Sequence, residues 1–148
     1  MKLRTGDPWM SAIDYSRSLH GLSINLLVAS IEPAVRFGTE VIGAEAVYSD
    51  PDFAVMVYAG QEWMLHADHT YEEHPHALRT HDAGARGAGL EIRIHGRSPD
   101  EAARAATALG CEILTPPADK AHGMRETYIL DPDGYTWVVD EYIGPPGK

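Results

Sequence analysis

The chain has 148 residues, a length that suits one compact domain or two small halves sharing a core. Its composition, 44% hydrophobic and 23% charged, excludes a disordered or fibrous chain. A formal net charge of −10 without a Lys/Arg cluster speaks against nucleic acid as a partner. No apolar run approaches the roughly 20 residues of a membrane span, so we expect a cytoplasmic protein with no membrane partner.

The first half of the chain begins with an expected N-terminal extension, residues 1–20, followed by a module at 22–68. Alternating apolar residues predict a strand at 22–28, and a helical pattern follows. Ser30 is the expected N-cap of that helix, and Gly43 is its expected left-handed end. Three further strands are predicted at 44–48, 53–58 and 62–67.

A polar segment rich in histidine and glycine, residues 69–89, is predicted to be a linker with one short helix near 76–83. The stretch 66–76 contains four histidines and three carboxylates, which resembles a metal cluster in composition. It lacks the helical or closed Cys/His spacing that converges such donors on one point. We therefore interpret it as a solvated loop at the rim of a site.

The order strand, helix and three strands recurs in a second module at 90–143. Ser98, Pro99 and Glu101 predict a capped helix start with proline at the first helical position, and Gly110 marks the end. The sequence Asp131-Pro132-Asp133-Gly134 predicts a hairpin turn. The remaining strands are predicted at 90–95, 111–114, 126–130 and 135–140.

This internal repeat predicts an α+β fold of two strand-helix-three-strand (βαβββ) modules, whose curved mixed sheets form a concave ligand cleft. Alternation in the strand 90–95 turns its apolar residues toward the helix and its polar ones toward the cleft. We predict that six residues of the two modules line one pocket. They are Glu91, Arg93 and His95 in the second module, and Asn25, Met64 and His66 in the first.

Arg125 and Tyr128 are two further candidate ligand-binding residues, on the strand before the predicted turn. Their positions differ by three, so they cannot both face the same side of a regular strand. We expect one of them to serve packing.

The doubled module, together with the run Gly123 to Trp137 that carries the turn, resembles the vicinal oxygen chelate superfamily of glyoxalases, bleomycin resistance proteins and ring-cleaving dioxygenases. The resemblance covers about residues 22–143. It implies the fold predicted above. It also implies a homodimer, because members pair their modules within or between chains and a four-stranded module leaves sheet edges open.

The resemblance also says where a divalent metal would be bound. Its four ligand positions fall on Ser23, on Met64, on Gly89 or Glu91, and on Val138. A catalytic metal needs about three nitrogen or carboxylate donors, and at most one of these positions supplies a ligand. We therefore expect no metal cofactor at the usual place.

Two functions remain open on these residues. One is a metal-free protein of the bleomycin resistance type, which sequesters a small molecule, including a cationic one. The other is an enzyme, namely a lyase, an isomerase or a dioxygenase. It would use a rearranged metal site at His66, Glu91 and His95, or Glu91 and His95 as acid and base. We expect a small-molecule ligand in either case.

Overall fold

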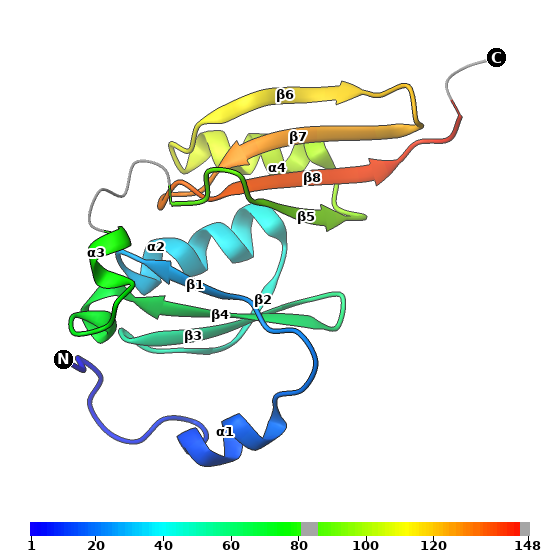
Figure 1. Ribbon diagram of the computed structural model, residues 1–148. Helices are drawn as coiled ribbons and strands as arrows, with labels where there is room; N and C mark the ends of the chain where they lie inside the picture. The colour runs from blue at the N-terminus through cyan, green and yellow to red at the C-terminus, as the bar shows by residue number, and fades with distance from the viewer. Residues whose placement is uncertain (81–85, 146–148) are drawn as a thin grey trace. The chain divides into compact units, whose positions relative to one another are not determined.

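The computed structural model describes residues 1–80 and 86–145, and these form two compact units, each built on a four-stranded sheet (Figure 1). Unit 1 comprises Met1–Val35 and Ala44–His81, and unit 2 comprises Arg36–Gly43 and Asp82–Lys148. Both sheets follow the predicted order of strand, helix and three strands.

Unit 1 holds a mixed sheet with the strand order β1-β4-β3-β2. Strands β1 and β4 run parallel, and the other pairs are antiparallel. The first and last strands, β1 and β2, are the edges of the sheet. Its elements are α1 (Ala12–Ser18), β1 (Asn25–Val28), α2 (Ile31–Arg36), β2 (Glu45–Ser49), β3 (Phe53–Tyr58), β4 (Gln61–Ala67), η2 (Asp68–Tyr71) and α3 (Ala77–Thr80).

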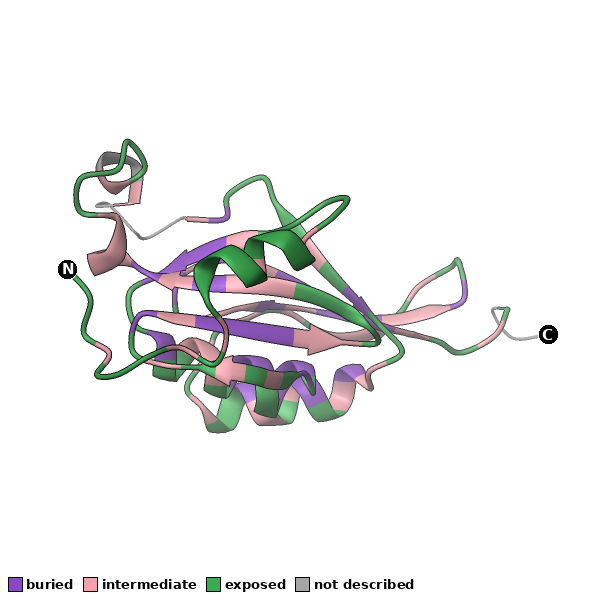
Figure 2. Ribbon diagram, turned by 90° about the horizontal axis from the view of Figure 1, so that it is seen from below, coloured by how far each residue is buried: buried purple, intermediate pink, exposed green. Residues whose placement is uncertain are grey.

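The two faces of the unit 1 sheet have different partners. One face carries fully buried residues such as Val28, Met56 and Ala67, and it packs against α2. Helix α1, which has no buried residue, lies on the opposite face (Figures 1 and 2). The N-terminal segment thus covers the sheet face that the repeat pattern leaves without a helix.

The helix predicted after β1 is formed, but its second half is wider than an α-helix. Helix α2 continues directly into the π-helix η1 (Phe37–Ile42), which belongs to unit 2 and packs against α4. Gly43 ends this helix with φ 78°, as predicted, because glycine adopts the left-handed region without steric cost.

Unit 2 repeats the topology of unit 1 with the strand order β5-β8-β7-β6. Its core lies under α4 and η1, where Trp137 packs near Phe37 with ring centroids 5.8 Å apart. Beyond η1, its elements are β5 (Glu91–His95), α4 (Pro99–Ala108), β6 (Ile113–Asp119), β7 (Met124–Leu130) and β8 (Thr136–Tyr142).

The local signals in the second module act as predicted. The Ser98 side chain accepts a hydrogen bond from the Glu101 amide and caps α4, with Pro99 at its first position. In the β7–β8 hairpin, the Asp131 side chain accepts bonds from the amides of Asp133 and Tyr135, at 2.9 and 3.0 Å. The turn is therefore held by its own aspartate.

Strand β6 is longer than predicted, because it includes Pro116 and Pro117. Prolines are tolerated there because β6 is an edge strand, and its register shifts between Thr115 and Ala118. In the predicted linker helix, Ala77–Thr80 is helical, and the part from 81 to 83 lies outside the described residues. None of the helices in 1–80 and 86–145 has the length and apolar character needed to cross a membrane.

Candidate functional site

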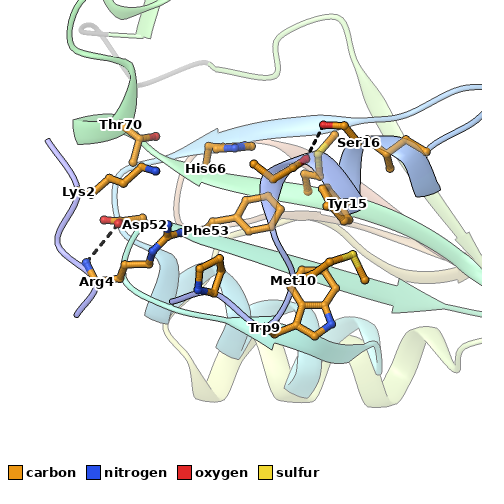
Figure 3. Close-up of a pocket in the computed structure, with 14 residues that line it drawn as sticks. Lys2, Arg4, Trp9, Met10, Tyr15, Ser16, Asp52, Phe53, His66 and Thr70 are labelled. Carbon is orange, nitrogen blue, oxygen red and sulfur yellow. Dashed lines mark hydrogen bonds between the residues drawn. The ribbon is translucent and has the colours of Figure 1, made fainter. Parts of the chain in front are cut away.

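A pocket of about 370 Å³ lies on the face of the unit 1 sheet that α1 covers (Figure 3). Its volume is within the range of small-molecule sites. The sheet contributes Phe53, Met64 and His66, and the N-terminal segment contributes a wall that includes Trp9 and Tyr15. The whole pocket belongs to unit 1.

Strand register explains why these sheet residues share a face. Phe53 on β3 lies opposite His66 on β4, and Met64, two residues away from His66, pairs with Asn25 on β1. Alternate residues of a strand point to the same side. Three predicted site residues, Asn25, Met64 and His66, are therefore brought together as expected.

Aromatic rings form a continuous series along this face. Trp9 stacks on Tyr48 with centroids 4.8 Å apart and also lies 5.5 Å from Tyr15. Tyr15 meets Phe53 edge-on at 5.6 Å, and Phe53 lies 4.7 Å from His66. The walls of the pocket are thus built mainly from rigid apolar surfaces, which suit the binding of a flat molecule.

Asp52 attaches the N-terminal segment to the sheet. Its buried carboxylate accepts hydrogen bonds from the amides of Leu3 (2.6 Å) and Arg4 (3.2 Å), and it contacts His69 Nε2 at 2.7 Å. Burial by itself would raise the pKa of Asp52. The three hydrogen bonds outweigh burial and lower the pKa below its ordinary value.

His66 is held in one orientation by its neighbours. Its Nδ1 lies 2.6 Å from Asn25 Oδ1, and the Asn25 amide nitrogen donates to the Tyr71 hydroxyl at 3.0 Å. Burial lowers the pKa of His66 and favours the neutral ring, against the opposing charge of Asp50. With the Asn25 amide so placed, Nδ1 carries the proton and Nε2 is a hydrogen-bond acceptor.

Tyr15 supplies a buried hydroxyl group. Its Oη has no hydrogen-bond partner among the described residues. Burial, followed by the nearby carboxylate of Glu62, raises the pKa of Tyr15 to about 12, so the hydroxyl keeps its proton. A buried donor without a partner is costly, and a ligand that accepts from it would remove this cost.

The polar face of unit 2 carries a network of charges around Arg93. The guanidinium donates to Glu91 at 3.0 Å, to Glu126 at 3.0 Å and to Asp140 at 3.2 Å. Glu126 and Asp140 are buried, at 5% and 1% exposure, and Asp140 also contacts His95 Nδ1 at 2.6 Å. Burial opposes the charge of Arg93, but these contacts and Tyr128 together raise the pKa of its guanidinium.

Glu91, Arg93 and His95 therefore share a face of β5, as alternation predicted. They lie in unit 2, whereas Asn25, Met64 and His66 lie in unit 1. The convergence of all six on one pocket, and a metal site of His66, Glu91 and His95, remain predictions. Glu91 already forms an ion pair with Arg93.

Arg125 and Tyr128 lie on opposite faces of β7. Arg125 forms a bidentate pair with Asp100 at the start of α4, at 2.7 and 2.9 Å, and a further pair with Asp119 at 2.7 Å. Tyr128 lies on the face of Glu126 and donates to it at 3.4 Å. Of these two candidates, Arg125 is the one that holds helix to sheet.

Sequence reasoning missed the N-terminal half of the pocket and the buried carboxylates of unit 2. Trp9 and Tyr15 were a usable signal, because a solvated extension does not need large aromatic residues. Asp140 was also accessible in principle: it lies two residues after Val138 on the predicted strand, and a carboxylate among apolar residues needs a partner.

The side chains at the metal positions implied by the resemblance do not fit a catalytic metal. Met64 offers a thioether and Val138 a hydrocarbon, and Val138 is fully buried on β8. Within residues 1–80 and 86–145, no group of three or more His, Cys, Asp or Glu is arranged to hold a metal ion.

Comparisons with known proteins agree with this fold. The model of the Glyoxalase/Bleomycin resistance protein/Dioxygenase superfamily matches residues 22–139. No curated protein matches the chain.

Several solved structures share the fold at low sequence identity. A family enzyme from Burkholderia phytofirmans PsJN is 16% identical, with TM-score 0.67 over 81% of this chain and 96% of that one. A family protein from Nocardioides is 24% identical, with TM-score 0.59 over 92% and 95%. The fosfomycin resistance protein FosX from Listeria monocytogenes is 21% identical, with TM-score 0.61 over 83% and 93%.

Proposed function

The chain belongs to the glyoxalase/bleomycin resistance protein/dioxygenase superfamily, and on that premise we propose that it is a metal-free protein that binds and sequesters a small molecule. The observation that carries the proposal is the pocket of unit 1, with its aromatic walls and its buried hydroxyl group without a partner. Because members of one fold differ in chemistry, the argument rests on this site rather than on the fold.

The construction of the pocket supports binding more than catalysis. Its polar groups, His66 and Asp52, are held by other protein groups, namely Asn25 for the imidazole and backbone amides with His69 for the carboxylate. Side chains fixed in this way orient a ligand at little entropic cost. Met64, at one of the positions implied for a metal ligand, instead adds apolar surface to the wall.

A protective role is consistent with the family. Its description includes bleomycin resistance proteins, and one structure with this fold is a fosfomycin resistance protein. Sequestration needs affinity and a protective wall around the ligand. The N-terminal segment, attached through Asp52, provides such a wall.

A thermal-shift screen of small organic molecules, on protein dialysed against EDTA, tests the proposal. A ligand at 100 times its dissociation constant stabilises the fold by about 2.7 kcal/mol, or about 5–10 °C for a chain of this size. Trp9→Ala removes a wall of the pocket and should reduce the shift. Tyr142→Ala, a change at an exposed aromatic of unit 2, should leave it intact.

Two outcomes would contradict the proposal. If no compound stabilises the protein, or if Trp9→Ala leaves every shift unchanged, the pocket is not the binding site. If binding needs a divalent metal and is abolished by EDTA, the protein is not metal-free, and the enzyme with a rearranged His/Glu site becomes the better description.

A further inference from the structure

The inner part of the pocket offers one hydrogen-bond donor and one acceptor. The donor is the Tyr15 hydroxyl, which is buried without a partner among the described residues. The acceptor is His66 Nε2, since Asn25 occupies the other ring nitrogen. Phe53 makes ring contacts with both residues, so its face forms the floor between the two polar groups.

The charged groups lie at a different end of the pocket. Figure 3 shows Lys2, Arg4 and Asp52 gathered at one end, Tyr15 at the other, and Phe53 with His66 between them. Arg4 forms an ion pair with Asp50 at 3.8 Å, and Asp52 is engaged by amides and His69. A ligand between His66 and Tyr15 would therefore meet neutral polar groups.

The walls around these two groups favour a flat ligand. Trp9 and Phe53 present ring surfaces, and Met10 and Met64 present polarizable thioethers that adapt to an aromatic edge. A permanently charged ligand would lose its hydration in this part of the pocket without gaining an opposite charge.

We infer that the ligand of this pocket is an uncharged, planar aromatic molecule that carries one N–H or O–H donor for His66 and one acceptor for Tyr15. The inference rests on the proposed function and specifies its ligand class. It departs from the cationic ligand that the overall charge of −10 and Glu91 had favoured. Recognition of this kind rejects close analogues that lack one polar group, because a protein group is then left unpaired.

Four matched compounds test the inference by calorimetric titration. They are 4-quinolinone, which has both groups; its N-methyl derivative, which lacks the donor; quinoline-4-carboxylate, an anion; and 1-methylquinolinium, a cation. We expect 4-quinolinone to bind about fivefold or more tightly than its N-methyl derivative, the size of one neutral hydrogen bond. The two charged compounds should bind more weakly still.

Two variants assign the preference to the named residues. Tyr15→Phe removes only the hydroxyl and should weaken 4-quinolinone about fivefold without lowering the stability of the ligand-free protein, since that hydroxyl has no partner there. His66→Asn keeps a polar group next to Asn25 and withdraws the Nε2 acceptor, so the N-methyl compound should then bind as well as its parent. Tyr48→Phe, which removes a hydroxyl bonded to Asp50, is the control that should leave the preference unchanged.

The outcomes separate this inference from the proposed function. If other compounds of the thermal-shift screen bind in a Trp9-dependent way but the charged quinolines bind as well as 4-quinolinone, the inference is wrong and the proposed function stands. An unchanged affinity of Tyr15→Phe for 4-quinolinone would also overturn the inference. If no compound binds at all, both fail.

Discussion

Asp52 is the residue on which the position of the N-terminal segment depends. It links Leu3 and Arg4 to the sheet across some fifty residues of sequence, and it is 3% exposed. A buried carboxylate with three hydrogen-bond donors is stable as long as it is ionised. The wall of the pocket therefore depends on one charge.

Asp52→Asn should release this segment. The variant places an amide nitrogen near a backbone donor, and the loss of charge-assisted hydrogen bonds should lower the free energy of unfolding at pH 7 by about 1.5–3 kcal/mol. Trypsin should then cleave at Arg4 and Arg17 faster than in the parent protein. Asp7→Asn, a change at an exposed carboxylate of the same segment, is the control.

The same residue predicts a pH dependence. The pKa of Asp52 is lowered in the folded protein, so its contribution is fully present above its unfolded value of about 3.9 and is lost as pH falls through the folded value. The stability difference between the parent and Asp52→Asn should stay constant from pH 7 to 5 and shrink below about pH 4. A constant difference down to pH 2 would contradict this account.

At the scale of single elements, α4 shows how far local signals reach. Its start is fixed by Ser98, whose side chain accepts from the Glu101 amide at 3.3 Å. Its position against the sheet is fixed by Arg125, which binds Asp100 in the first turn with two hydrogen bonds. The first contact is local in sequence, and the second joins residues 25 positions apart.

Ser98→Ala should lower the free energy of unfolding by about 1 kcal/mol, the usual cost of an N-cap, because the Glu101 amide loses its acceptor. Chemical denaturation measures this loss. Ser49→Ala, at an exposed position at the end of β2, should have no effect. An unchanged denaturation midpoint in Ser98→Ala would remove the cap from the account of α4.

The sheet of unit 2 depends on Arg93 in a different way. Glu126 and Asp140 lie opposite each other on β7 and β8, both are buried, and both accept from the Arg93 guanidinium. Two like charges on directly opposed residues destabilise a sheet unless a cation lies between them. Arg93 therefore links three strands.

Arg93→Met should destabilise the protein by about 3 kcal/mol, because it leaves two buried carboxylates without their cation. Denaturation at pH 7 measures the effect. Adding Glu126→Gln and Asp140→Asn to that variant should restore part of the stability. Arg17→Met, which breaks an exposed pair with Asp14, is the control and should cost less than about 0.5 kcal/mol. Equal losses in both single variants would contradict the explanation.

At the scale of the whole molecule, the open edges of both sheets bear on assembly. β2 and β6 are edge strands, and they expose apolar residues, Val47 at 43% and Leu114 at 47%. Unpaired edges with apolar side chains favour pairing with another chain. Both edges also contain a register irregularity, which restricts how a partner strand can pair.

We expect the protein to form a homodimer, in keeping with the resemblance and with these edges. Sedimentation at micromolar concentration and 0.15 M salt measures the mass. A species of twice 16.2 kDa is expected. A monomer across the whole concentration range would contradict assembly between chains.

The amino-acid sequence by itself determined the repeated strand-helix-three-strand order, the ends of the helices at Gly43 and Ser98, and the hairpin at Asp131. It also determined which side of β5 is polar. These features follow from interactions between residues close in sequence and from the period of two in a strand. Physical reasoning could therefore reach them without coordinates.

Only the tertiary structure decided what the polar faces contact. It placed Trp9 and Tyr15 over Phe53, joined Asp52 to Leu3, and set Glu126 against Asp140. Each of these contacts joins segments far apart in the chain, and its energy depends on burial that no local pattern encodes. The order of the elements is thus a local property of this sequence, whereas its pocket is a product of packing.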